Sequence, residues 1–187
     1  KAKEVYMGNF GLKVNRFYEI FVEQNGYVMV LEGLKNTLLI AVIGLIIGIV
    51  IGTLIAAIRT IPQYKVLPRV LNGICSVYVG IFRGTPMVVQ LLVFYYVMLP
   101  LMGVKMTGVQ VSMIVFGLNS AAYISEIMRS GIMSVDSGQM EAGRAVGLSY
   151  GTTMMKIVIP QAVKNILPTL GNEFIALIKE TSVVSFV

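Results

Sequence analysis

The chain has 187 residues, of which 56% are hydrophobic and only 13% are charged, a composition too apolar for the surface of a soluble domain. Its net charge of +6 does not indicate nucleic-acid binding, because the basic residues lie beside apolar runs and form no dense stripe, so membrane orientation explains them better. The absence of histidine argues against classical serine or cysteine triads and against zinc and haem sites. The single cysteine, Cys75, excludes an internal disulfide framework. A Ser/Lys nucleophilic pair stays open, although no pattern indicates one.

The first 36 residues are too charged to cross a membrane but are rich in aromatic side chains. Phe17, Ile20, Phe21 and Gln24 recur at helical spacing, which predicts an amphipathic helix lying on a membrane surface. The segment lacks the clean apolar core of a cleaved signal peptide. We therefore expect residues 1–36 to form a separate amphipathic segment.

Residues 37–58 form a charge-free run long enough to cross a hydrocarbon core of about 30 Å at about 1.5 Å per residue. Gly44, Gly48, Gly52 and Ala56 recur at every fourth position and leave one face open for close helix packing. We interpret this face as a contact within the chain rather than between subunits.

A second charge-free run covers residues 84–104, and Pro86 is tolerable in its first helical turn because no N–H is needed there. This division predicts Arg83 near the cytoplasmic headgroups and the short apolar segment 71–82 along, or dipping into, the interface. Gln90 is a polar residue within the predicted span.

Residues 106–125 form the third predicted span, in which Asn119 must bury an amide. Glu126 and Arg129 follow at helical spacing near its exit. Basic residues follow the first and third spans, whereas the connection between the second and third contains only Lys105. This asymmetry predicts the N-terminus outside the cell and residues 136–162 inside.

Residues 136–162 are a polar, glycine-punctuated insert that predicts two short helices suited to docking. Asp136 can cap the first helix, and Gly147 can end it in a left-handed conformation. Ser149 can cap a second helix, which Pro160 is expected to stop. Small side chains on the first helix allow another backbone to approach closely: Ala142, Gly143 and Ala145.

Residues 162–187 are the least clear stretch, because Glu173, Lys179 and Glu180 interrupt its hydropathy. Hydropathy alone does not predict a span here, and a buried or interfacial helix is the alternative. The chain begins at Lys1 rather than methionine and ends at Val187 in an apolar stretch, so a fragment of a longer protein is one interpretation.

The insert contains a spaced pattern: Glu141-Ala142-Gly143, three residues, Gly147, nine residues, Ile157, one residue, then Ile159 and Pro160. This pattern resembles the cytoplasmic loop of ABC importer permeases. The family pattern has alanine at its third position and commonly leucine before its proline, so Gly143 and Ile159 are departures that keep the spacing. The phrase RGTPMVVQLLVFYY also resembles the second transmembrane region of permeases for polar amino acids. By this resemblance, the residues that couple to the ATP-binding subunit are Glu141, Ala142, Gly143, Gly147, Ile157 and Pro160.

The resemblance implies an all-α membrane protein with a helical bundle of about four spans, where the family has a fifth. Residues 37–187 would be the transmembrane domain, and the stretch NEFIALIKETSVVS would belong to a fourth span whose polar residues face a pathway. The predicted substrate path contains Gln90, Asn119 and Glu173. For Glu173 two readings stay open: a charged partner, either a cationic or zwitterionic substrate or a fixed group such as Lys179 on another helical face, and a carboxyl hydrogen-bonded between helices.

The function implied is the membrane subunit of an ATP-driven importer of polar amino acids in a prokaryotic cytoplasmic membrane. Its partners would be an ATP-binding subunit that holds ATP and magnesium, a second permease subunit, identical or paralogous, and an extracytoplasmic binding protein. The chain has no glycine-rich phosphate loop ending in Gly-Lys-Ser/Thr, so ATP hydrolysis is expected of the partner and this chain is expected to be a transport subunit rather than an enzyme. The alternative is a channel or an ion-coupled secondary transporter, against which the lack of inverted repeats argues weakly.

Overall fold

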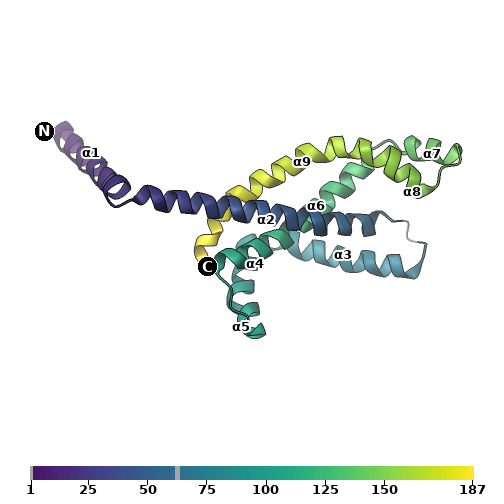
Figure 1. Ribbon diagram of the computed structural model, residues 1–187, viewed down its shortest axis with the longest axis horizontal. Helices are drawn as coiled ribbons and strands as arrows, with labels where there is room; N and C mark the ends of the chain where they lie inside the picture. Colours follow the sequence, from purple (N-terminus) through teal and green to yellow (C-terminus); the bar gives the residue numbers. More distant parts are fainter. Residues whose placement is uncertain (1, 62–63) are drawn as a thin grey trace. The chain divides into compact units, whose positions relative to one another are not determined.

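In a computed structural model of the chain, residues 2–61 and 64–187 are described, and every regular element in them is helical (Figure 1). The chain divides into two compact units, residues 1–38 and residues 39–187. The all-α class predicted from the sequence is confirmed.

The first unit consists of α1 (Ala2–Tyr18), the π-helical turn η1 (Glu19–Glu23) and the start of α2 (Gly26–Thr60). A turn at Asn25, with φ of 56°, separates η1 from α2. Phe21 stacks on Phe17 with ring centroids 5.3 Å apart and meets the edge of Tyr27 at 6.3 Å. The helical spacing expected here is therefore present, and the location on a membrane surface stays a prediction.

The second unit is built around α6 (Gly108–Met133), which contacts α3, α4 and α9 and receives the glycine face of α2. Phe116, near the middle of α6, is fully buried. The other elements of this unit, besides residues 39–60 of α2, are α3 (Val66–Gly84), α4 (Met87–Val93), η2 (Phe94–Met98), α5 (Leu99–Met102), α7 (Ser137–Ala145), α8 (Tyr150–Thr153), η3 (Met154–Val158), α9 (Ile159–Glu180) and η4 (Thr181–Phe186).

The glycine face of α2 packs directly against α6, as the spacing predicted. A Cβ atom added to Gly48 would lie 2.9 Å from the Cβ of Ser120, and one added to Gly52 would lie 2.9 Å from the carbonyl oxygen of Ala121. Only glycine allows this separation between the two helices. The contact lies within the chain, in agreement with the intramolecular interpretation.

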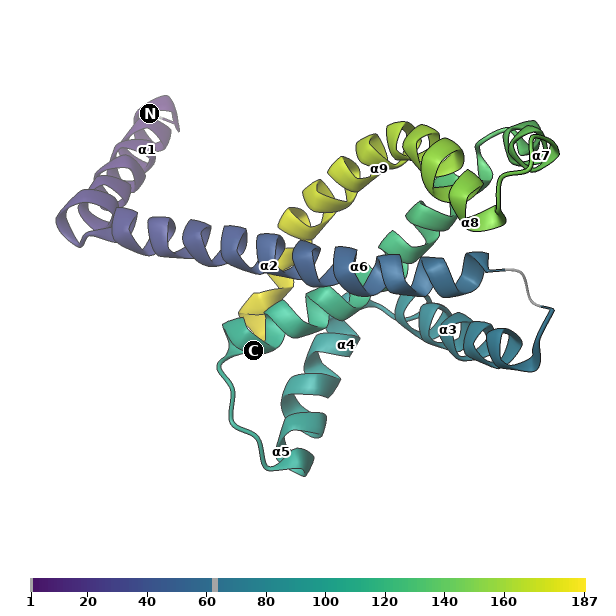
Figure 2. The same cartoon turned by 45° about the vertical axis from the view of Figure 1, so that its right-hand side comes forward.

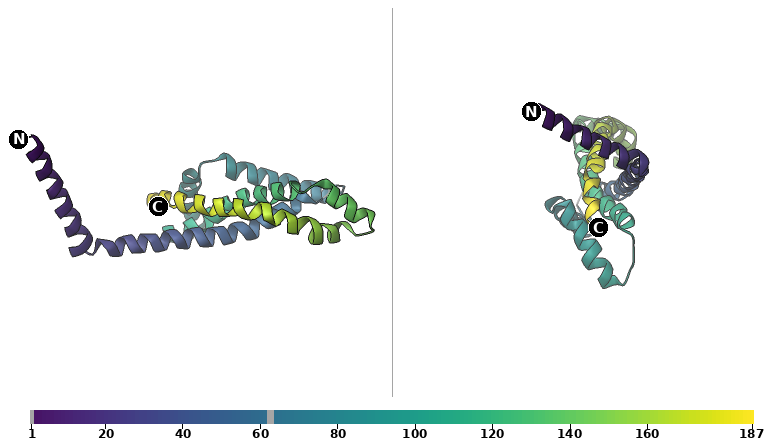
Figure 3. Two further views of the ribbon diagram at one scale, coloured as in Figure 1. Left: turned by 90° about the horizontal axis from the view of Figure 1, so that it is seen from above. Right: turned by 90° about the vertical axis from the view of Figure 1, so that its left-hand side faces the viewer.

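Three helices in the described part of the chain are long and apolar enough to cross a membrane by length and composition: α2, α3 and α6. The stretch from α4 to α5 is apolar but shorter. α9 has 22 residues and packs along α6 (Figure 3). It is not among the three apolar helices, which agrees with the low hydropathy of its sequence.

The structure divides the region around Pro86 differently from the sequence prediction. Instead of a short interfacial segment followed by a span over 84–104, α3 is a helix of 19 residues and a shorter helical stretch follows it. Thr85 is extended, with φ −117° and ψ 143°, because a residue that precedes proline is disfavoured in the helical region. Figure 2 shows the chain changing direction at this point, between α3 and α4.

Candidate functional site

The predicted docking loop lies between α6 and α9 and consists of α7, a tight turn, α8 and η3 (Figure 1). The side chain of Asp136 caps α7, where its Oδ1 accepts a hydrogen bond from the backbone N–H of Gly138 at 2.7 Å. Gln139 does not reach back to complete a capping box; its side-chain oxygen accepts a bond from Gln161 instead, at 3.2 Å. The cap therefore comes from Asp136 as predicted.

The turn after α7 depends on Gly147, which has φ of 86°. The N–H of Gly147 donates to the carbonyl of Arg144 at 3.0 Å, and the N–H of Leu148 donates to the carbonyl of Gly143 at 3.1 Å. This pair of bonds is the Schellman arrangement, which satisfies carbonyls left unpaired at a helix end. The predicted left-handed end of the helix at Gly147 is confirmed by this φ angle, which glycine adopts without the strain that a side chain would bring.

The second docking helix starts at Ser149, whose hydroxyl accepts from the N–H of Thr152 at 3.2 Å. The prediction that Pro160 stops this helix was wrong, because the chain continues through η3 into α9. In η3 the turns widen, and the N–H of Ile159 donates to the carbonyl of Met154, five residues back. Such a π-helical turn accommodates a proline that lacks an N–H.

The residues predicted to couple to another subunit differ in exposure. Glu141 and Ala142 are exposed on α7, whereas Gly143 is buried. Ile157 is half-buried and Pro160 is exposed at the start of α9. Val146 at the end of α7 was not predicted as part of this surface, although it is 77% exposed and adds an apolar side chain to the tip of the loop. The signal in the sequence was an apolar residue directly before the turn glycine.

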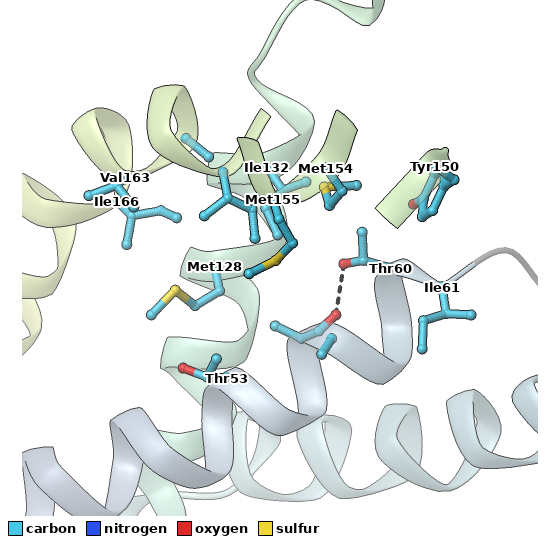
Figure 4. Close-up of a pocket in the computed structure, with 14 residues that line it drawn as sticks. Thr53, Thr60, Ile61, Met128, Ile132, Tyr150, Met154, Met155, Val163 and Ile166 are labelled. Atoms are coloured by element: carbon cyan, nitrogen blue, oxygen red, sulfur yellow. Dashed lines mark hydrogen bonds between the residues drawn. The ribbon is translucent and has the colours of Figure 1, made fainter. Parts of the chain in front are cut away.

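An apolar cavity of about 400 Å³ lies between α2, the end of α6, the docking loop and the start of α9 (Figure 4). Its polar atoms belong to side chains such as Thr53, Thr60 and Tyr150, and the Thr60 hydroxyl already donates to the carbonyl of Ala56 at 2.7 Å. Burial raises the pKa of Tyr150 above the ordinary value of a phenol. A cavity without charged groups does not suit a polar or ionic substrate.

Gln90 and Asn119, two residues of the predicted substrate path, are brought together in the structure. The Asn119 amide donates to Gln90 Oε1 at 2.9 Å and to the carbonyl of Phe82 at 3.1 Å. The Gln90 amide donates to the same carbonyl at 2.8 Å and to the hydroxyl of Thr85 at 2.8 Å. Both amides therefore tie the break between α3 and α4 to α6.

Glu173 of α9 lies on the neighbouring side of α6, where its Oε1 accepts a hydrogen bond from Ser120 at 2.9 Å. Ser120 is fully buried and Glu173 is half-buried. Lys179 is exposed and forms no ion pair with Glu173 among the described residues. Within that part of the chain, no group of three or more acidic, cysteine or histidine side chains could hold a metal ion.

A cluster of three charged side chains joins α2 to α6 near the docking loop. Glu126 pairs with Arg59 of α2 through one carboxylate oxygen, and its other oxygen accepts from Arg129 at 2.9 Å. The contact between Glu126 and Arg129 was expected from their spacing. The contact with Arg59 was not, because the two residues are distant in the sequence.

Residues 48–187 match a family model described as "Binding-protein-dependent transport system inner membrane component". The putative glutamine transport system permease protein GlnP of Rickettsia bellii (strain RML369-C) is 42% identical over 156 residues, which cover 83% of this chain and 69% of that protein. The arginine transport system permease protein ArtQ of Bacillus subtilis (strain 168) is 40% identical over 158 residues, covering 84% and 70%. The L-cystine transport system permease protein TcyB of the same organism is 37% identical over 164 residues, covering 88% and 68%.

Solved structures support the same relationship. A crystal structure of an amino acid ABC transporter with histidines aligns with a TM-score of 0.78 and 36% identity, over 89% of this chain and 75% of that one. An inward-facing structure of the MetNI methionine ABC transporter aligns with a TM-score of 0.69 over 82% of this chain and 71% of that one. Its identity of 19% supports the fold alone.

Proposed function

Because this chain belongs to the family of binding-protein-dependent transport system inner membrane components, we propose that it is the membrane-spanning subunit of an ATP-driven importer of polar amino acids. The observation that carries the coupling part of the proposal is the preformed docking loop, which leaves α6, exposes Glu141 and Ala142, and returns into α9. Relatives named for glutamine, arginine and cystine transport support the substrate class.

The partners follow from this role. An ATP-binding subunit would receive the exposed face of α7 and would carry ATP and magnesium, which this chain is not proposed to bind. A second permease subunit, identical or paralogous, would complete the pathway, and an extracytoplasmic binding protein would deliver the amino acid. The assembly would lie in a prokaryotic cytoplasmic membrane, surrounded by lipid, with the N-terminus outside and the docking loop inside.

Within the pathway, we propose that Glu173 meets the ammonium or guanidinium group of the substrate. A carboxylate at mid-membrane depth costs roughly 2.5–3.5 kcal/mol on insertion scales, so it requires water or a partner. Ser120 contacts one of its oxygens, and the residue stays half-buried rather than enclosed. Gln90 and Asn119 are proposed to shape the pathway wall, since their amide groups already bond to each other and to α3.

The experiment that tests coupling replaces Gly147 by aspartate in the assembled complex. The conformation at Gly147 disfavours a non-glycine residue by about 1 kcal/mol, and aspartate also adds bulk and charge, so Gly147→Asp should displace the turn while the spans stay inserted. Amino-acid-stimulated ATP hydrolysis and transport should fall together.

Gly151→Asp is the matched control. Gly151 is also exposed in the docking loop, and a Cβ at either glycine would meet no atom within 4 Å, but the backbone of Gly151 is helical whereas that of Gly147 is left-handed. The control should keep most of the stimulation. Normal coupling in Gly147→Asp would show that the loop only connects two helices.

A further inference from the structure

The two docking helices pack tightly where Gly143 of α7 faces Thr153 at the end of α8. Gly143 is buried, and Thr153 is fully buried. A Cβ atom on Gly143 would collide with the Cγ2 methyl of Thr153 and would lie 2.9 Å from its Oγ1 and 3.2 Å from its Cβ. The methyl group of Thr153 therefore occupies the space that an alanine side chain would need.

Thr153 is held in place from its own side. Its hydroxyl donates to the carbonyl of Ser149 at 3.0 Å, and its N–H donates to the same carbonyl at 2.9 Å. A β-branched side chain in a helix has few rotamers available, so Thr153 cannot turn its methyl group away without losing this bond. The side chain is thus fixed both to the start of α8 and against α7.

We propose that Gly143 and Thr153 are a matched pair that sets the position of α7 relative to α8, which makes Thr153 a positioning residue for coupling. The contact fixes the helix that presents Glu141 and Ala142, both exposed, to a partner. The departure from alanine at Gly143 then has a physical reason in this chain, because Thr153 supplies the methyl group from the opposite helix. The inference rests on the proposed function and deepens it.

The test is a mutant cycle in the reconstituted complex with its ATP-binding subunit. Gly143→Ala introduces the clash, and Thr153→Ser removes the methyl group but keeps a hydroxyl for Ser149. Overpacking a fixed contact should lower the amount of amino acid transported per ATP about fivefold or more in Gly143→Ala. Thr153→Ser alone leaves the space of the methyl group empty and should also lower the transport per ATP. The double variant should recover most of the lost coupling, because the alanine methyl group at position 143 refills that space.

A second cycle covers the case in which Gly143→Ala cannot be recovered as a complex. Thr153→Ala leaves a void instead of a clash and should also lower the transport per ATP, while Gly143→Ala combined with Thr153→Ala refills the void and should restore it. Thermal stability and recovery of the complex are measured in parallel. If the substitutions lower recovery but leave transport per ATP unchanged, the pair is merely structural and the proposal is overturned.

The outcomes separate this proposal from the proposed function. If Gly147→Asp uncouples the complex while Gly143→Ala does not, the matched pair is refuted and the docking role of the loop stands. If the parent complex shows no amino-acid-dependent ATP hydrolysis, both are refuted. Rescue of either single variant by its matched second substitution supports the pair, because two independent structural defects would add rather than cancel.

Discussion

Replacing Gly52 by alanine tests the packing of α2 on α6. The new Cβ atom would lie 2.9 Å from the carbonyl oxygen of Ala121 and 2.9 Å from both Cβ and Cγ2 of Ile124. A backbone carbonyl and a branched Cβ cannot retreat unless α6 itself moves. At Gly44 the added atom would lie 3.3 Å from the Cβ of Phe116, a contact that a shift of a few tenths of an ångström relieves. Gly44→Ala is therefore the matched control.

The expected magnitudes follow from two opposing effects. Alanine stabilises a helix interior by roughly 0.5–1 kcal/mol relative to glycine. Overpacking costs about 1–3 kcal/mol, and this cost should apply in full only at Gly52. Gly52→Ala should therefore lower the free energy of unfolding by about 1–2 kcal/mol, and Gly44→Ala should change it little.

The assay is thermal unfolding of the purified complex in detergent, monitored for both variants under one set of conditions. For a chain of this size, 1 kcal/mol corresponds to about 2–4 °C in Tm, so Gly52→Ala should melt roughly 2–8 °C below the parent. Gly44→Ala should melt within about 2 °C of it. Equal midpoints, or a larger loss at Gly44, would refute the close approach of the two helices at Gly52.

Two further predictions concern orientation and the pathway. In a Cys75→Ala background, cysteine in place of Ser149 should be labelled only from the cytoplasm and cysteine in place of Lys105 only from outside; the reverse pattern would overturn the orientation. Glu173→Gln should lower transport or change selectivity between cationic and neutral amino acids while binding of the ATP-binding subunit persists, whereas Glu180→Gln at the exposed end of α9 should not. Unchanged uptake kinetics in Glu173→Gln would remove this residue from the pathway.

The docking loop could be predicted from the sequence in detail because its determinants are local. The cap at Asp136, the left-handed turn at Gly147 and the cap at Ser149 each depend on hydrogen bonds between residues no more than five positions apart. The glycine spacing of α2 likewise predicted a close packing face, because i, i+4 positions share one side of a helix.

Other features depend on contacts that a sequence does not display. Hydropathy predicted that a span begins after Arg83, because charge-free residues follow it. In the structure α3 continues to Gly84, and the carbonyl of Phe82 accepts a hydrogen bond from Asn119, which is distant in the sequence. The continuation of the helix through Pro160 depends on a shift to π-helical turns, for which no single residue is a signal. The pairing of Glu126 with Arg59 has the same long-range origin.

Uptake of amino acids into sealed vesicles that contain the purified chain tests the central claim most directly. The chain would be reconstituted with its ATP-binding subunit, its second permease subunit and its binding protein, and uptake would be driven either by ATP or by an imposed ion gradient. We expect uptake that requires ATP and the ATP-binding subunit and that is lost in Gly147→Asp but kept in Gly151→Asp. Uptake that follows an ion gradient without ATP would contradict the account and identify a channel or a secondary transporter.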